Sequence, residues 1–101
     1  HWMVHSFPTR RSSDLSMMRA LMGDSGAAVR AEMITALQDL ARLDATMREL
    51  LAPAWRDSSS LVRLRVLELY VTHRPTDWRV RAAAVREDAD PRLRLLAKAA
   101  L

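Results

Sequence analysis

The sequence predicts an all-α fold, an α-solenoid in which about three antiparallel helix pairs stack into a right-handed superhelix. Half of the 101 residues are hydrophobic but only 5% are aromatic, and the common residues Leu, Ala and Arg favour helices over strands. Two glycines and four prolines are the only strong breakers in the whole sequence. A short motif that begins with aspartate recurs three times at helical-hairpin spacing.

Composition and charge exclude several classes of protein. The sequence has no cysteine, which excludes disulfides and thiolate metal sites and suits a reducing cytoplasm, where we expect the chain to reside. No apolar run approaches the roughly 20 residues that span a bilayer, so we expect no membrane partner. The net charge is +4, and Lys98 is the only lysine among sixteen basic residues. Because the arginines are dispersed among acidic residues, the codon bias of a GC-rich genome explains them better than nucleic-acid binding does.

The first fifteen residues lack any helical period and are predicted to be a non-native or disordered segment. Residues 5–15, HSFPTRRSSDL, resemble residue for residue the translation of a widely used short-read sequencing adapter. Such a segment is set aside in predicting the fold. The alternative is a native disordered arm with a basic Arg10-Arg11 pair. The chain also begins without Met and stops at Leu101 inside a helical pattern, so we expect a fragment of a longer protein.

The remaining residues, 16–101, divide into three units of about 16–43, 44–74 and 75–101. The stretches DSGAAVR, DSSSLVR and DADPRLR open the second helix of each unit, and their aspartates are 33 and then 31 residues apart. First helices are predicted at 16–22, 46–55 and 77–86, with Pro53 ending or kinking the second of them near Leu51. The positions that define the motif are Asp24, Val29, Arg30, Asp57, Val62, Arg63, Asp88, Leu93 and Arg94.

The motif aspartates and arginines have two interpretations. The aspartates precede a helix, where a carboxylate accepts backbone N–H bonds and favours the positive helix end. Each arginine is expected to pair with an aspartate of its own or a neighbouring unit, since guanidinium suits partly buried bidentate contacts. The alternative is a positive ladder of arginines that contacts phosphates or acidic peptides.

This motif resembles that of HEAT repeats, and most closely the bacterial HEAT-like repeats of phycobilisome lyases. Residues 16–101 carry the resemblance, with Met33-Ile34 and Val66-Leu67 replacing the usual paired alanines and Leu93 replacing valine. The resemblance implies a superhelix of helix pairs. It also implies two alternative functions, as a bilin-lyase subunit, which would be an enzyme, or as a nucleic-acid-binding protein of the DNA-alkylation-repair type.

No pattern in the sequence predicts a catalytic, cofactor-binding or metal-binding residue. Asp39, Asp44 and Glu49 have no base or nucleophile at a telling spacing and are interpreted as a solvated face. His73 is the only histidine after residue 15, and it is predicted to lie in a last helical turn. Trp55 and Trp78 are predicted to pack between units.

The predicted function is therefore a non-catalytic scaffold for protein–protein interaction, with no cofactor. A protein or peptide partner is expected along the second helices, nucleic acid is a less favoured partner, and exposed ends of the stack favour self-association. Solvent-facing positions of the second helices are the candidate contact residues: Glu32, Thr35, Arg65, Glu68 and Lys98.

Overall fold

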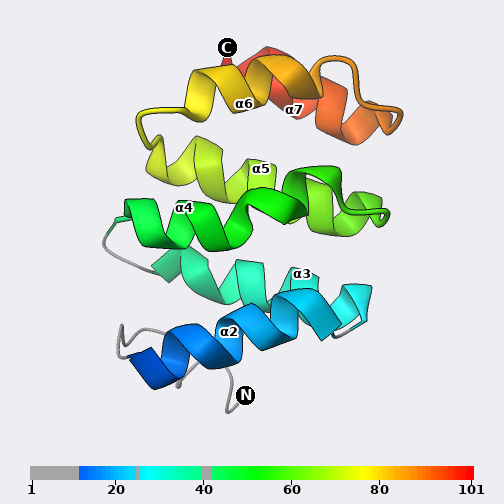
Figure 1. Cartoon of the computed structure of the whole chain (residues 1–101). Coiled ribbons are helices and arrows are strands. Elements are labelled where there is room, and N and C mark those ends of the chain that lie inside the picture. Colours follow the sequence, from blue (N-terminus) through cyan, green and yellow to red (C-terminus); the bar gives the residue numbers. More distant parts are fainter. Residues whose placement is uncertain (1–11, 25, 40–41) are drawn as a thin grey trace.

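A computed structural model describes residues 12–24, 26–39 and 42–101 of the chain (Figure 1). All regular structure in these residues is helical, so the prediction of an all-α fold is confirmed. None of the described helices combines the length and the apolar character needed to cross a membrane. The α-helices are α2 (Ser12–Asp24), α3 (Ala27–Ala36), α4 (Ala45–Leu51), α5 (Ser60–His73), α6 (Trp78–Val85) and α7 (Pro91–Ala100), and two 3₁₀ helices are η1 (Leu37–Asp39) and η2 (Ala52–Arg56).

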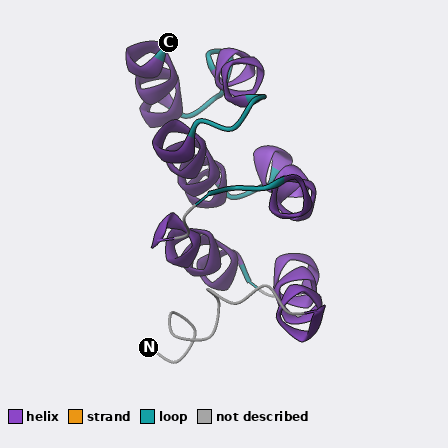
Figure 2. Cartoon of the chain, turned by 90° about the vertical axis from the view of Figure 1, so that its left-hand side faces the viewer, coloured by secondary structure: helices purple, strands orange, loops and turns teal. Residues whose placement is uncertain are grey.

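The helices lie in two layers. In Figure 2, α3, α5 and α7 follow one another along one side, and α2, α4 and α6 along the other. Contacts join α3 to α5 and α5 to α7 within the first layer, and α2 to α3 and α6 to α7 across the layers. Helices α2 and α7 therefore lie toward opposite ends of the stack (Figure 1).

Helix ends follow local chemistry. Asp44 is the N-cap of α4, and its carboxylate accepts a hydrogen bond from the amide of Met47 at 3.0 Å. Pro53 lies just after the end of α4, where the chain tightens into η2, as its missing N–H predicts. Helix α5 ends at Arg74, whose φ of 48° is left-handed, and Pro75 follows. His73 occupies the last turn of α5, where its Nε2 lies 3.2 Å from the carbonyl oxygen of Gln38.

Two boundaries differ from the sequence interpretation. Helix α2 begins at Ser12, inside the segment that was set aside, and Leu15 packs against the core; residues 1–11 lie outside the described part of the chain. The motif aspartates do not occupy the N-cap positions of the second helices. Those positions belong to Gly26, Ser59 and Asp90. The reason is that the turn is longer than predicted, by two residues in the second and third units.

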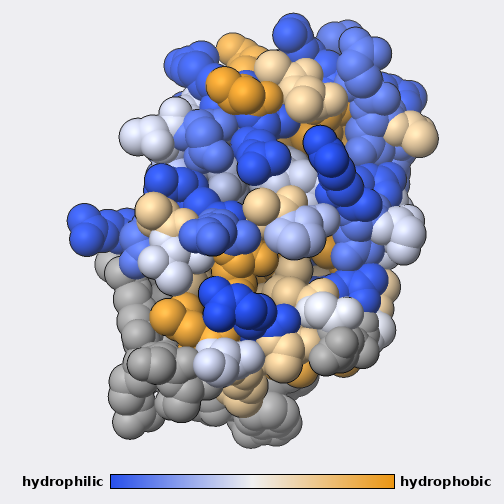
Figure 3. All heavy atoms as spheres, in the orientation of Figure 1, coloured by the Kyte–Doolittle hydropathy of each residue, from blue (hydrophilic) through white to orange (hydrophobic). Residues whose placement is uncertain are grey.

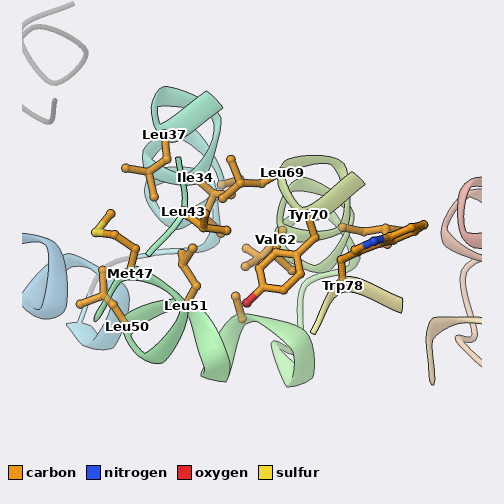
Figure 4. Packing of buried hydrophobic residues seen from close by; sticks show 14 of the residues in the cluster. Ile34, Leu37, Leu43, Met47, Leu50, Leu51, Val62, Leu69, Tyr70 and Trp78 are labelled. Carbon is orange, nitrogen blue, oxygen red and sulfur yellow. The ribbon is translucent and has the colours of Figure 1, made fainter. Parts of the chain in front are cut away.

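The core runs between the two layers (Figure 4). The apolar spacing of Val62, Val66, Leu69 and Tyr70 in the sequence predicts one buried face of α5, and all four side chains are buried. Leu51 of α4 is also buried. Burying each such side chain stabilises the fold by about 1.5–3 kcal/mol. The spacing of Val29, Met33, Leu37 and Leu40 predicts a corresponding face in the first unit, of which Leu40 lies outside the described residues. Residues from both layers contribute to this core. Its other buried side chains include Met18, Met33, Ile34, Leu37, Leu43, Met47, Leu50, Leu67, Leu93 and Ala97.

Candidate interaction surface

An arginine of each earlier unit binds the motif aspartate of the next unit. Arg30 on α3 donates from Nε to Oδ2 of Asp57 at 2.8 Å and from Nη2 to Oδ1 at 3.0 Å. Arg63 on α5 contacts Asp88 in the same way, at 2.9 Å and 3.2 Å. The four side chains are between 10% and 18% exposed. Two parallel hydrogen bonds of this kind fix the orientation of the guanidinium and the carboxylate and also strengthen their attraction.

Each of these aspartates also shapes its own turn. Oδ1 of Asp57 accepts the amide of Ser59 at 2.9 Å, and Oδ1 of Asp88 accepts the amide of Asp90 at 2.8 Å. These are Asx turns, in which a carboxylate binds the backbone two residues on. The aspartates thus organise the turn that precedes the second helix, while Asp90 caps α7 directly.

The electrostatic state of the two aspartates follows from these contacts. Burial acts to raise the pKa of Asp57, but hydrogen bonds from Arg30 and from the amide of Ser59 outweigh it, so the pKa lies below its usual value. Asp88 is similar: burial is opposed by Arg63 and the amide of Asp90, and the net pKa is lowered. Both carboxylates are therefore ionised at neutral pH.

Arg94, the third motif arginine, has a different set of partners. Its Nη1 donates to the carbonyl oxygens of Asp88 at 2.7 Å and Ala89 at 3.0 Å. Arg63 makes the corresponding bond to the carbonyl of Asp57 at 2.6 Å. Since Arg30 and Arg63 are engaged by carboxylates, the three arginines do not form the ladder of unpaired positive charge that a phosphate backbone would require.

Three of the five candidate contact residues border one hollow between α3 and α5. Glu32 and Thr35 contribute from α3 and Arg65 from α5, around a volume of about 270 Å³. The rest of its lining is apolar and comes from Ala28, Ala31 and Leu61. The hydroxyl of Thr35 donates to the carbonyl of Ala31 at 3.0 Å, which leaves its oxygen able to accept.

Of the other two candidate contact residues, Glu68 lies beside this hollow and Lys98 lies apart from it. Glu68 is one turn from Arg65 on α5 and accepts a hydrogen bond from its Nη1 at 2.8 Å. Lys98 instead borders a separate hollow of about 270 Å³ on the third unit, together with Arg86, Pro91, Arg94 and Leu95. The five positions therefore belong to two places on the surface.

Trp55 lies on η2 and Trp78 opens α6. Trp55 has neighbours in its own unit and, through Arg81 at 5.7 Å from its ring centre, in the third unit. Trp55 of η2 packs edge-on against Tyr70 of α5, with ring centroids 4.8 Å apart. The guanidinium carbons of Arg74 and Arg79 lie 4.6 Å and 4.8 Å from the ring centre of Trp78. The sequence analysis did not single out these cation–π contacts; Arg79 follows Trp78 directly on α6, whereas Arg74 lies across the left-handed turn that ends α5.

The acidic residues that were interpreted as a solvated face are placed on separate elements. Asp44 caps α4, Asp39 ends η1, and Glu49 borders a hollow between α2 and α4. Within the ranges that the structure describes, no group of three or more His, Cys, Asp or Glu side chains could hold a metal ion. No protein-family model, curated protein or solved structure matches this chain, so the role of the surface has to be inferred from its geometry.

Proposed function

We propose that this chain is a HEAT-like α-solenoid segment that acts as a non-catalytic scaffold, binding an extended peptide or protein segment along the layer of α3, α5 and α7. The proposal rests mainly on the hollow between α3 and α5. The recurring contact from Arg30 to Asp57 and from Arg63 to Asp88 supports the repeat architecture, because equivalent residues join consecutive units.

The hollow has the chemistry of a peptide site. Its apolar lining can take a small hydrophobic side chain, and the polar side chains of Glu32 and Arg65 stand at its edges, Arg65 in an ion pair with Glu68. The hydroxyl oxygen of Thr35, which is exposed, can accept a hydrogen bond from a backbone N–H of the bound peptide. Few, separated polar groups around an apolar floor orient a ligand and favour one register over others.

Nucleic-acid binding is the weaker candidate. Two of the three motif arginines are held by aspartates, and the ion pair from Arg65 to Glu68 neutralises another cation of this layer. A protein that binds a phosphate backbone needs several unneutralised cations along one face.

A random peptide library displayed on phage tests the scaffold proposal directly. The full chain is immobilised, and the library is panned against it. The affinity of the enriched peptides is then measured for the parent chain and for Thr35→Trp, whose indole would fill the hollow. We expect Thr35→Trp to weaken binding at least tenfold. The matched control is Thr72→Trp, because Thr72 is also exposed and donates to a carbonyl four residues back, at 2.9 Å, on α5 outside this hollow.

Enriched peptides that bind Thr35→Trp and Thr72→Trp equally would contradict the proposed site. Failure to enrich any peptide would contradict peptide binding by this layer. Binding of a duplex oligonucleotide at moderate salt, with a steep salt dependence, would favour the nucleic-acid alternative instead.

A further inference from the structure

A further hollow, of about 200 Å³, opens between η2 and α6, on the side of the stack where α2, α4 and α6 lie. Both η2 and α6 pack on α5, so this hollow is enclosed by the second and third units and is not at an end of the stack. Figure 3 looks onto this side of the molecule and shows strongly hydrophilic side chains with apolar ones set among them. The residues that line the hollow are Trp55, Arg56, Arg81, Ala84, Val85 and Asp88.

Positive charge is in excess around the hollow between η2 and α6. Arg56 is exposed and has no carboxylate partner within the part of the chain that the structure describes. Asp88 is already bound by Arg63 through two hydrogen bonds. An excess of positive charge in a hollow favours an anionic ligand. The lining residues and the ion pairs connected to them contain four guanidiniums and two carboxylates, those of Arg48, Arg56, Arg63, Arg81, Asp77 and Asp88.

Arg81 is attracted to a carboxylate of the chain without a direct hydrogen bond to it. Its Nε lies 3.7 Å from Oδ2 of Asp77, and Nε of Arg48 lies 3.6 Å from Oδ1 of the same carboxylate. Both distances exceed those of a direct hydrogen bond, about 2.7–3.2 Å. The guanidinium of Arg81 also lies 5.7 Å from the ring centre of Trp55, another residue of the lining. A carboxylate between Arg56 and Arg81 would therefore meet N–H donors that are still able to bind it.

The rest of the lining favours an acidic peptide over a phosphate backbone. Trp55, Ala84 and Val85 give the hollow an apolar part, against which an aliphatic side chain beside the acidic one can pack. The indole of Trp55 is held edge-on by Tyr70, so this apolar surface is fixed in position. A nucleic acid needs several unneutralised cations along one face, whereas the lining has two arginines and the carboxylate of Asp88.

We propose that the hollow between η2 and α6 is a second docking site, which binds an acidic segment of a protein partner. A carboxylate of the segment lies between Arg56 and Arg81, and a neighbouring aliphatic side chain packs against Trp55. Charge complementarity selects this occupant, because the guanidiniums attract a carboxylate and leave a neutral amide without an ionic partner. The site belongs to the opposite layer from the hollow between α3 and α5 and does not depend on peptide binding there.

An NMR titration of the full, isotopically labelled chain tests the acidic-segment proposal. The probes are two short synthetic peptides, one in which leucine alternates with glutamate and one in which leucine alternates with glutamine. We expect the glutamate peptide to shift the Nε–H signals of Arg56 and Arg81 and the indole N–H signal of Trp55. The glutamine peptide should bind at least about tenfold more weakly, because it forms no charge-assisted hydrogen bonds with the two guanidiniums.

Arg56→Gln and Arg81→Gln should each weaken binding of the glutamate peptide at least about fivefold, because each removes one guanidinium from the hollow. The matched control is Arg79→Gln, which removes the same charge from an exposed arginine of α6. Because the guanidinium of Arg79 stacks on Trp78 and does not line the hollow, this change should alter the affinity less than about twofold.

Ala84→Phe tests the shape of the same hollow without changing any charge. Ala84 is exposed, so the larger side chain can be accommodated, and it should weaken binding at least about fivefold by filling the hollow. Its control is Ala99→Phe, at an exposed alanine of α7 outside the hollow, which should leave the affinity unchanged. Circular dichroism checks that each variant remains helical.

Failure of the glutamate peptide to bind, or to bind more tightly than the glutamine peptide, would overturn the proposal. An equal loss of affinity in Arg79→Gln, Arg56→Gln and Arg81→Gln would also overturn it, since binding would then reflect only the general positive charge of the chain. Displacement of the glutamate peptide by a duplex oligonucleotide at moderate salt would assign the hollow to a phosphate backbone instead. Thr35→Trp should leave the affinity for the glutamate peptide unchanged, so failure of this site and failure of the site between α3 and α5 are distinguishable.

Discussion

Arg30 and Asp57 lie 27 residues apart in the sequence and are joined by two parallel hydrogen bonds, from Nε to Oδ2 and from Nη2 to Oδ1. The same oxygen, Oδ1, also accepts the amide of Ser59, so one carboxylate couples the helix of one unit to the turn of the next. Arg63 and Asp88 repeat the arrangement. Stability of this chain therefore depends strongly on contacts between neighbouring units.

The coupling between Arg63 and Asp88 is measurable by a double-mutant cycle. With Arg63→Met, Asp88→Asn and their combination, urea unfolding followed by circular dichroism should give an interaction energy on the order of 1 kcal/mol. The control pair, Arg65 and Glu68, is more exposed and lies within one helix, so its coupling should be no more than about 0.5 kcal/mol. Equal interaction energies in the two pairs would show that the contact between units contributes no more to stability than an exposed ion pair within one helix.

The lowered pKa of Asp57 and of Asp88 makes folding sensitive to acid. A carboxyl whose pKa is lower in the folded state stabilises the fold above its unfolded pKa, about 3.9, and loses that contribution as the pH falls through its folded pKa. The free energy of unfolding should therefore change little between about pH 5 and pH 7 and fall steeply below about pH 4. Urea titrations at a series of pH values measure this.

Asp57→Asn combined with Asp88→Asn is the variant that tests the assignment of the acid transition. Neither amide titrates, so the fall below pH 4 should become shallower, although the chain is less stable at neutral pH. An unchanged slope would attribute the acid transition to other carboxyls.

Two leucines provide a matched test of which faces of the helix stack are covered by other helices. Leu67 is fully buried, whereas Leu95 is 67% exposed. Leu67→Ala should lower the free energy of unfolding by about 2–5 kcal/mol. Leu95→Ala should change it by about 0.5 kcal/mol or less when the chain is dilute enough to be monomeric. A large loss in Leu95→Ala under those conditions would mean that this face is already covered.

The sequence was sufficient to predict the helical class and several boundaries, because these depend on local chemistry. Pro53 was predicted to end or kink a helix near Leu51, and α4 ends there, because proline lacks the N–H that the next helical hydrogen bond needs. The start of α2 at Ser12 was not predicted, since residues 1–15 were interpreted as a non-native or disordered segment, whereas Leu15 packs against the core.

The candidate site was predictable only where spacing along a helix determines neighbours. Glu32 and Thr35 are three residues apart on α3 and necessarily share a face, but their approach to Arg65 depends on how α3 packs against α5. Lys98 has an equivalent position in the sequence, yet it borders a different hollow at the α6–α7 end. Nothing in the sequence alone distinguishes an inner unit from a terminal one.

Tyr70 is the only tyrosine in the chain, so its ionisation can be followed without interference. Burial, reinforced by the negative charge of Asp77, raises the pKa of its phenol above the ordinary value of about 10. The folded chain should therefore form phenolate, measured by absorbance near 295 nm, only at a pH higher than the same chain does in concentrated urea.

The pH dependence of stability that arises from Tyr70 has the opposite sign to the one that arises from Asp57 and Asp88. Because the pKa of Tyr70 is higher in the folded state, its contribution is complete below the unfolded pKa and is lost as the pH rises toward the folded one. Asp77→Asn removes a negative charge and should lower the pKa of the folded phenol. Identical phenolate titrations in folded and urea-unfolded chains would show that Tyr70 is exposed to solvent, and would contradict its packing between η2 and α5 beside Trp55.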